Sequence, residues 1–161
     1  MVVVADSSPL HYLLLIGQIE ILPALFQRIV IPPEVQRELA HASAPQIMRE
    51  FIARVPAWLT VVSPTSVETI PEIDAGERAA INLARELHAD LLLIDDFAGR
   101  EAAAQRGIAI IGTIGVLEVA ATRSLLDLPT VIDRIRETTF RVSDELLDDV
   151  LRRHRQRASR E

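Results

Sequence analysis

The chain has 161 residues, of which 49% are hydrophobic and 25% are charged, and its formal net charge is -6. This length and composition predict one compact domain with a sizeable core, and they exclude a disordered or low-complexity chain. The absence of cysteine excludes disulfides, zinc–thiolate sites and thiol nucleophiles. The absence of lysine excludes a P-loop lysine, a Schiff base and a lysine general base.

No apolar run reaches the roughly 20 residues that a membrane-spanning helix needs, and the N-terminus lacks the features of a signal peptide. We therefore expect a cytoplasmic protein that does not enter a membrane. The acidic balance does not exclude a nuclease, whose acidic pocket holds metal and needs only local arginines for phosphate. Residues 150–161 hold five arginines and one acid, and we interpret them as a solvated last helix with cations at its C-terminal end.

Short apolar runs between turn residues predict the strands. In chain order these runs are Val2–Ala5, Arg28–Ile31, Leu59–Val62, Leu91–Ile94 and Ile108–Ile111. Between them, apolar residues recur at three- and four-residue spacing, which indicates helices. Strands that are apolar on both faces and joined by helices predict an α/β fold, in which a parallel sheet is covered on both sides.

Breaker residues and helix caps mark the joints between these elements. Pro32-Pro33 ends the second strand, and Ser63–Ile73 forms the longest predicted loop. After Leu126 the pattern is helical only, with a predicted cap at Ser143. We predict a single domain over residues 1–161, with a C-terminal helical extension at about 127–161 that could cover the sheet or carry a partner.

Two of the predicted strands end directly in acid. Asp6 follows the first strand, and Asp95-Asp96 follows the fourth. In an open parallel sheet, ligands bind beyond the carboxyl ends of the strands, so these carboxylates meet if the two strands are neighbours. The alternative is that each aspartate only caps the helix that follows it. The repetition of the pattern favours a shared site.

For two further acids, a local structural role explains their position as well as metal ligation does. Asp74-Ala75-Gly76-Glu77 fits a capping box, in which Glu77 reaches back to the amide of Asp74. Glu38 lies one turn after Glu34 on the next predicted helix, where ordinary solvation explains it. Both glutamates are also candidates for metal ligation.

A cluster of four or five carboxylates needs a cation, because like charges a few ångströms apart raise one another's pKa. Mg²⁺ and Mn²⁺ prefer oxygen ligands and use a few carboxylates together with water and substrate phosphate. Such a site polarises a phosphodiester and generates hydroxide from bound water. Phosphodiester cleavage is the reaction class that a site without cysteine or lysine supports best.

Other polar residues near these strand ends are candidates for contacts with a substrate. Arg100, one turn into the helix after Asp95-Asp96, can meet a phosphate, but it can equally pair with Asp96 or Glu101. Thr113 follows the fifth strand and can face the same edge, although we favour an N-cap role for it. The four histidines show no ligand-like spacing.

Five segments of the chain together resemble the PIN-domain superfamily, and more narrowly a PIN-like subgroup related to the VapC-type toxins. These segments are Asp-Ser-Ser-Pro-Leu at 6–10, Pro-Pro-Glu-Val-x-x-Glu-Leu at 32–39, Gly-Glu-Arg-Ala-Ala at 76–80, Leu-Ile-Asp-Asp-x-x-Gly-Arg at 93–100 and Gly-Thr-Ile-Gly-Val-Leu at 112–117. The likeness covers nearly the whole chain, and the segments occur in the order of the family.

The resemblance implies a three-layer α/β/α sandwich with a five-stranded parallel sheet of order 3-2-1-4-5. It also implies an endoribonuclease that uses one or two Mg²⁺ or Mn²⁺ ions, commonly a homodimer neutralised by a cognate antitoxin protein. The catalytic acids implied are Asp6, Glu38, Glu77, Asp95 and Asp96. All of these except Glu38 are implied metal ligands. We take Ser7, Arg100 and Thr113 as candidate substrate contacts.

The chain departs from the usual toxins at two of these acids. After the fourth strand the toxins have Thr/Ser-x-Asp, whereas this chain has Ile94-Asp95-Asp96, so either aspartate can be the fourth acid. The third acid is Glu77 in place of the commoner aspartate, which lengthens its reach by one methylene.

Two other functions compete with the ribonuclease. In a catalytically silent interaction module, the acids would serve as caps and the pocket would dock an arginine of a partner protein. A structure-specific DNA-repair nuclease is chemically possible, but the chain lacks room for the extra helical arch of such enzymes. A phosphorelay receiver domain requires a lysine after the fifth strand, and this chain has none.

Overall fold

The structure is a computed structural model that describes residues 1–161. Its contacts divide the chain into two compact units, Met1–Thr113 and Ile114–Glu161. The first unit holds every strand and every predicted acid of the site. The division falls earlier than the helical extension predicted from about residue 127, and the extent of the domains stays a prediction.

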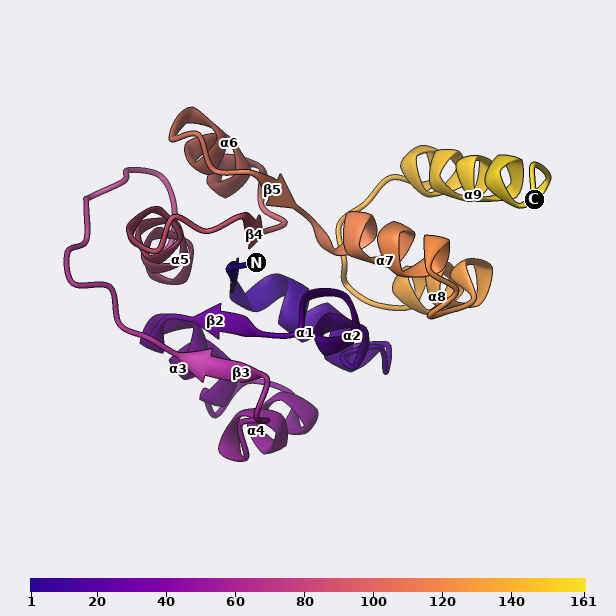
Figure 1. The fold of residues 1–161 in the computed structure, drawn as a ribbon. Helices are drawn as coiled ribbons and strands as arrows, with labels where there is room; N and C mark the ends of the chain where they lie inside the picture. The colour runs from indigo at the N-terminus through magenta and orange to yellow at the C-terminus, as the bar shows by residue number, and fades with distance from the viewer. The chain divides into compact units, whose positions relative to one another are not determined.

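A five-stranded parallel sheet forms the centre of the first unit, in the order β3-β2-β1-β4-β5. Its strands are β1 (Val3–Ala5), β2 (Ile29–Ile31), β3 (Leu59–Val61), β4 (Leu91–Leu93) and β5 (Ile110–Ile111). Each lies inside a predicted apolar run, shortened by one or two residues at its ends. The predicted parallel sheet and its order are confirmed, and β2 and β3 can be followed side by side in Figure 1.

Helices flank this sheet and complete the predicted three-layer α/β/α arrangement. In the first unit they are α1 (Ser7–Leu15), α2 (Ile21–Phe26), α3 (Pro33–Ala40), α4 (Gln46–Ala53), α5 (Ala75–Glu86) and α6 (Phe97–Gln105). Helix α5 packs against β1, β4 and α3, whereas α1 packs against α3 and α4. The fully buried side chains of Val4, Ile81 and Leu92 belong to one apolar cluster that joins α5 to the sheet.

The predicted long loop is present between β3 and α5 and is held by side chains of α5. The buried amide of Asn82 accepts from the backbone N–H of Glu68 at 2.9 Å and donates to its carbonyl at 3.1 Å. The buried Ile70 adds an apolar anchor from the loop itself. The path of the chain into α5, which carries Glu77, is therefore fixed.

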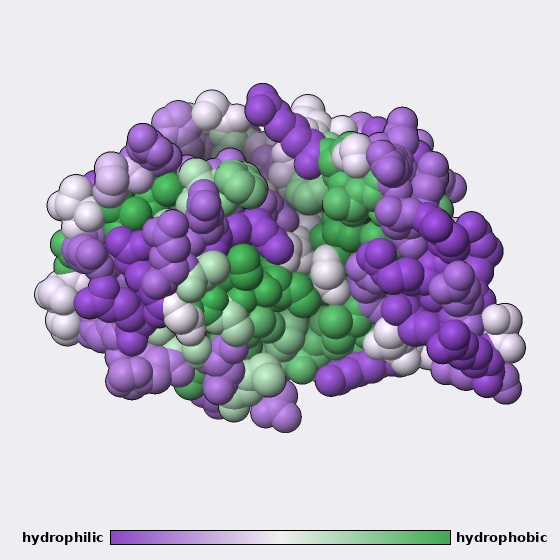
Figure 2. Space-filling view, turned by 90° about the horizontal axis from the view of Figure 1, so that it is seen from above, coloured by the Kyte–Doolittle hydropathy of each residue, from purple (hydrophilic) through white to green (hydrophobic).

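The second unit is helical, as predicted for the end of the chain. It contains α8 (Leu128–Arg136), α9 (Asp144–Ala158) and α7 (Thr113–Thr122), which begins at the last residue of the first unit. Ser143 caps α9 by accepting from the N–H of Leu146 at 3.1 Å, which confirms the predicted cap. Hydrophilic residues cover the right-hand part of Figure 2, where α9 lies. No helix has both the length and the apolar character needed to cross a membrane.

Candidate active site

The acids that end two of the strands lie at the same edge of the sheet. Strands β1 and β4 are parallel neighbours, with Ala5 opposite Leu93. The N–H of Asp6 donates to the carbonyl of Leu93 at 2.9 Å. Asp6 therefore lies beside the last residue of β4, close to where the chain continues into Asp95-Asp96. The adjacency on which a shared acidic edge depends is therefore present, and the carboxyl ends of these strands are where open parallel sheets bind ligands.

Asp6 occupies the N-cap position of α1, yet its side chain makes no capping hydrogen bond. The side chain is buried, and its Oδ1 has no hydrogen-bond partner. Burial raises the pKa of Asp6 well above its usual value, and the nearby carboxylates of Asp74, Glu38 and Glu77 raise it further against the lowering effect of the Ser7 amide. A buried carboxylate oxygen without a partner is costly, so its presence needs an explanation beyond capping.

Glu77 both caps its helix and faces other acids. The N–H of Glu77 donates to Asp74 Oδ1 at 2.8 Å, and Glu77 Oε2 accepts from the N–H of Asp74 at 3.2 Å, which confirms the predicted capping box. Burial raises the pKa of Glu77 to about 7, with further contributions from Asp74, Asp96 and Glu38. The capping role and the role as a candidate metal ligand, both suggested by the sequence, are therefore compatible for Glu77.

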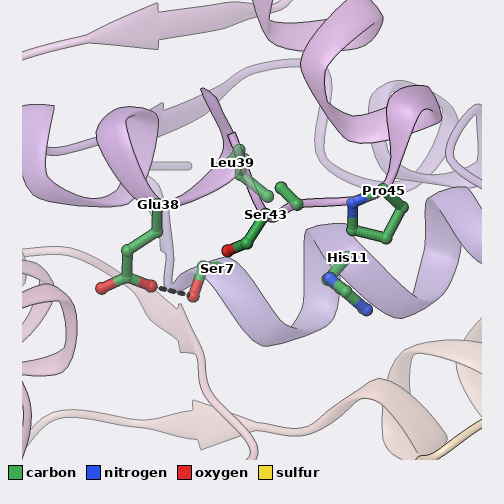
Figure 3. A pocket seen from close by; sticks show the side chains of 7 residues that line it. Ser7, His11, Glu38, Leu39, Ser43 and Pro45 are labelled. Atoms are coloured by element: carbon green, nitrogen blue, oxygen red, sulfur yellow. Dashed lines mark hydrogen bonds between the residues drawn. The ribbon is translucent and has the colours of Figure 1, made fainter. Parts of the chain in front are cut away.

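Glu38 projects from α3 toward the start of α5. Its Oε2 accepts from Ser7 Oγ at 2.5 Å, as Figure 3 shows. A Cβ added to Gly76 would lie 2.1 Å from Glu38 Oε1, so only glycine at that position lets the carboxylate approach so closely. Partial burial raises the pKa of Glu38; the Ser7 hydrogen bond opposes this, and Asp74 adds to it.

Asp74 is a member of this cluster that the sequence suggested only as a cap. Its charge raises the pKa of Asp6, Glu38 and Glu77, so it lies within electrostatic reach of all three. The signal in the sequence was its position at the N-cap of the helix that carries Glu77. We use the name acidic edge for the set Asp6, Glu38, Asp74, Glu77 and Asp96.

The two aspartates after β4 differ in their surroundings. Asp96 is exposed at the N-cap position of α6, forms no side-chain cap, and raises the pKa of Glu77. Asp95 instead accepts from Ser8 Oγ at 2.8 Å and from the N–H and Oγ of Thr113, each at 2.7 Å. Asp96 therefore belongs to the acidic edge, while Asp95 ties together the starts of α1 and α7.

Each of the three predicted substrate contacts forms a hydrogen bond within the protein. Thr113 is fully buried and is the first residue of α7, so the N-cap role favoured from the sequence is wrong, and both of its donors serve Asp95. Ser7 donates to Glu38. Arg100 Nη1 donates to the carbonyl of Ile94 at 2.9 Å, and within residues 1–113 no carboxylate forms an ion pair with it.

Comparison with known proteins places the chain in a family. A family model described as DUF3368, PIN domain, matches residues 2–156. The chain belongs to the PIN-domain family. Members of this family are generally metal-dependent nucleases. No curated protein matches the chain.

A solved structure supports the PIN fold independently. It is a PilT N-terminus domain protein from the hyperthermophilic archaeon Sulfolobus solfataricus P2, with a TM-score of 0.58 and 20% sequence identity. The match covers 74% of this chain and 93% of that one. At this identity the likeness concerns the fold alone.

The acidic edge of this PIN domain fits a hard divalent cation by its chemistry. All of its side chains offer carboxylate oxygens, and the ion pairs within residues 1–113 join other residues, so the edge has no protein counter-charge. Mutual repulsion and the unpartnered Oδ1 of Asp6 are the features that a bound Mg²⁺ or Mn²⁺ relieves. No group of three or more of these side chains is already arranged to hold an ion. The fit therefore rests on the donor set and on uncompensated charge.

We expect Thr113→Val to destabilise the PIN domain by about 1–2 kcal/mol, because it removes a buried donor to Asp95 while keeping the size of the side chain. Urea denaturation measures the loss of unfolding free energy. The matched control is Thr69→Val in the exposed loop before α5, which should change stability by less than about 0.5 kcal/mol. Equal effects of the two variants would contradict the role assigned to Asp95.

Proposed function

We propose that this PIN domain is a Mg²⁺- or Mn²⁺-dependent endoribonuclease that hydrolyses RNA phosphodiester bonds at the acidic edge. The observation that carries the proposal is the buried Asp6 Oδ1, which has no hydrogen-bond partner and belongs to a side chain within electrostatic reach of several other carboxylates. A protein retains such uncompensated charge at a cost to stability, and perturbed carboxyl groups of this kind cluster at functional sites.

The residues of the acidic edge divide into proposed roles. Asp6, Glu77 and Asp96 would hold one or two ions, with Glu38 oriented beside them by Ser7. When bound, the metal polarises the phosphodiester and lowers the pKa of an attacking water. Asp95 would act by positioning, because its oxygens accept from Ser8 and Thr113. Arg100, anchored on the Ile94 carbonyl, supplies a positive charge for a phosphate near the end of β4.

Glu77 has a second proposed role, in proton transfer. Its pKa of about 7 means that its carboxyl group gains and loses a proton near neutral pH. A general base works best when its pKa lies near the working pH. In a complex in which Asp6 and Asp96 hold the ion, Glu77 is therefore the acid that we assign to accept a proton from water.

The finer biological role is also a proposal. The ordered segments that resemble the VapC-type toxins support a toxin of a toxin–antitoxin pair, acting on RNA in the cytoplasm as a homodimer held in check by an antitoxin protein. The resemblance alone supports these partners, while the location is the expectation drawn above from the sequence. The neighbouring gene is the direct place to look for the antitoxin.

The proposal is tested with the purified full chain stripped of metal. We expect calorimetry to detect Mn²⁺ binding, and a single-stranded RNA oligonucleotide to be cut when Mn²⁺ or Mg²⁺ is added but not in the presence of EDTA. Binding without cleavage would contradict the ribonuclease and leave a metal-binding module. Absence of both would favour the catalytically silent interaction module, in which the acids serve only as caps.

A further inference from the structure

A cavity of about 250 Å³ adjoins the acidic edge, because Glu38 belongs to that edge and also lines the cavity together with its hydrogen-bond partner Ser7. Ser7 and His11 come from one side, on α1, while Ser43 and Pro45 come from the connection between α3 and α4 on the other (Figure 3). The remaining lining residues are Leu39 and Ala44. The cavity is thus lined by polar and apolar side chains together, and its polar groups are the ones that can orient a ligand.

The hydroxyl groups of this cavity present lone pairs and not protons. Ser7 Oγ donates its proton to Glu38 Oε2, so its own oxygen remains as an acceptor. The backbone N–H of Ser43 donates to His41 Nδ1 at 3.0 Å, which makes that nitrogen an acceptor. Ser43 Oγ lies 2.6 Å from the same nitrogen, and in the tautomer in which that nitrogen accepts, Ser43 Oγ donates its proton to it as well. In that tautomer of His41 both serine oxygens are free to accept.

His11 adds the one group of the cavity that can both donate and accept. Burial lowers the pKa of His11, so its imidazole is neutral at neutral pH and has one donor and one acceptor nitrogen. The ring packs edge-on against Tyr12, with the two ring centroids 4.8 Å apart. The imidazole lines the cavity, and no hydrogen bond to another side chain is formed by it.

We propose that this cavity binds one unpaired RNA base that carries an exocyclic amino group. An amino group has two N–H donors, which match the two accepting oxygens of Ser7 and Ser43, whereas a uracil edge offers a carbonyl oxygen at the same place. Single-stranded RNA is read by hydrogen bonds to the edges of splayed-out bases and by stacking on side chains such as histidine.

The size and place of the cavity agree with this occupant. Its volume lies below the roughly 300–1,000 Å³ of pockets for drug-sized ligands, so it has room for one base. A base seated against Ser7 lies next to Glu38, so the cavity places its occupant beside the acidic edge. The inference rests on the proposed ribonuclease function and gives that site a preference among RNA bases.

The test measures the binding of cytidine and uridine, a pair that differs at the amino group, to the metal-free full chain in EDTA. Nuclear magnetic resonance titration, observing the backbone amides and the His11 ring, gives both dissociation constants. We expect cytidine to bind about fivefold more tightly than uridine, the effect of roughly one net hydrogen bond. We expect Ser43→Ala to remove this preference and His11→Ala to weaken both ligands. The matched control is Ser66→Ala, an exposed serine outside the cavity, which should keep it.

Equal affinities for the two nucleosides, an unchanged preference in Ser43→Ala, or the absence of any shift would overturn the proposal. The last result is expected if the cavity takes a protein segment in place of RNA. Because binding is measured without metal, its outcome is separate from cleavage. A chain that prefers cytidine but cuts no RNA keeps this inference and loses the ribonuclease, while a chain that cuts RNA and binds both nucleosides alike does the opposite.

Discussion

Replacing Glu77 by glutamine is expected to lower metal-dependent RNA cleavage by at least about 100-fold, the scale on which a positioned proton-transfer group contributes. Glutamine keeps the size of the side chain and still serves at the third position of a capping box, so α5 should begin normally. The variant removes only the charge and the titratable proton. Asp6→Asn should cause a loss of at least the same order, because it removes the buried oxygen charge at the centre of the acidic edge.

Single-turnover cleavage of a labelled RNA in Mn²⁺ measures these losses. The matched controls are Glu101→Gln on α6, an exposed glutamate outside the acidic edge, and Asp133→Asn on α8, which is exposed in the second unit. Both controls should cleave at the rate of the unaltered chain. If Glu77→Gln and Asp6→Asn cleave as fast as the controls, the acidic edge is not the catalytic site.

The second large effect is on stability in the absence of metal. The pKa of Glu77 is raised from 4.5 to about 7 on folding, so the folded protein holds this proton more tightly than the unfolded chain. The associated stability is fully present below pH 4.5 and is lost as the pH rises through about 7. At one pKa unit per 1.36 kcal/mol, the loss reaches at most about 3 kcal/mol. Asp6 acts in the same direction, because its pKa is also raised.

Urea denaturation of the metal-free chain at intervals from pH 5 to pH 8 measures this loss. We expect the unfolding free energy of Glu77→Gln to change less over that range than that of the unaltered chain, and the variant to be the more stable of the two at pH 8. Adding Mn²⁺ at pH 8 should then stabilise the unaltered chain more than the variant. Parallel pH profiles of the two proteins would refute the repulsion assigned to the acidic edge.

The architecture could be predicted because it follows from local patterns. Each strand lies in a short apolar run, which is fully buried in β1 and less so in β3 and β5, and the breakers between runs fix where the strands end. The observed strands lie within the predicted runs, as Leu91–Leu93 does within Leu91–Ile94. The sheet order came from the family resemblance, since chain spacing does not state which strands pair. Once β1 and β4 are neighbours, Asp6 and Asp96 reach one edge.

The details of the site depend on contacts between distant parts of the chain, so the sequence could not supply them. Asp74 looked like a cap because its local hydrogen bond to Glu77 is real, while its effect on Asp6 and Glu38 requires the folded arrangement of α1, α3 and α5. The difference between Asp95 and Asp96 depends on Thr113, which is 18 residues further along the chain from Asp95. No local pattern distinguishes two adjacent aspartates.

The hydrogen bonds of Asp95 also bear on the moment at which the acidic edge is completed during synthesis. Asp95 joins Ser8, which is 87 residues earlier, to Thr113, which is 18 residues later. A ribosome delivers the chain from its N-terminus, so a nascent polypeptide that has not yet released Thr113 lacks one side of this junction. The edge therefore gains its final support only after about two thirds of the chain has emerged, and a truncated product of translation would carry the acids without the frame that positions them.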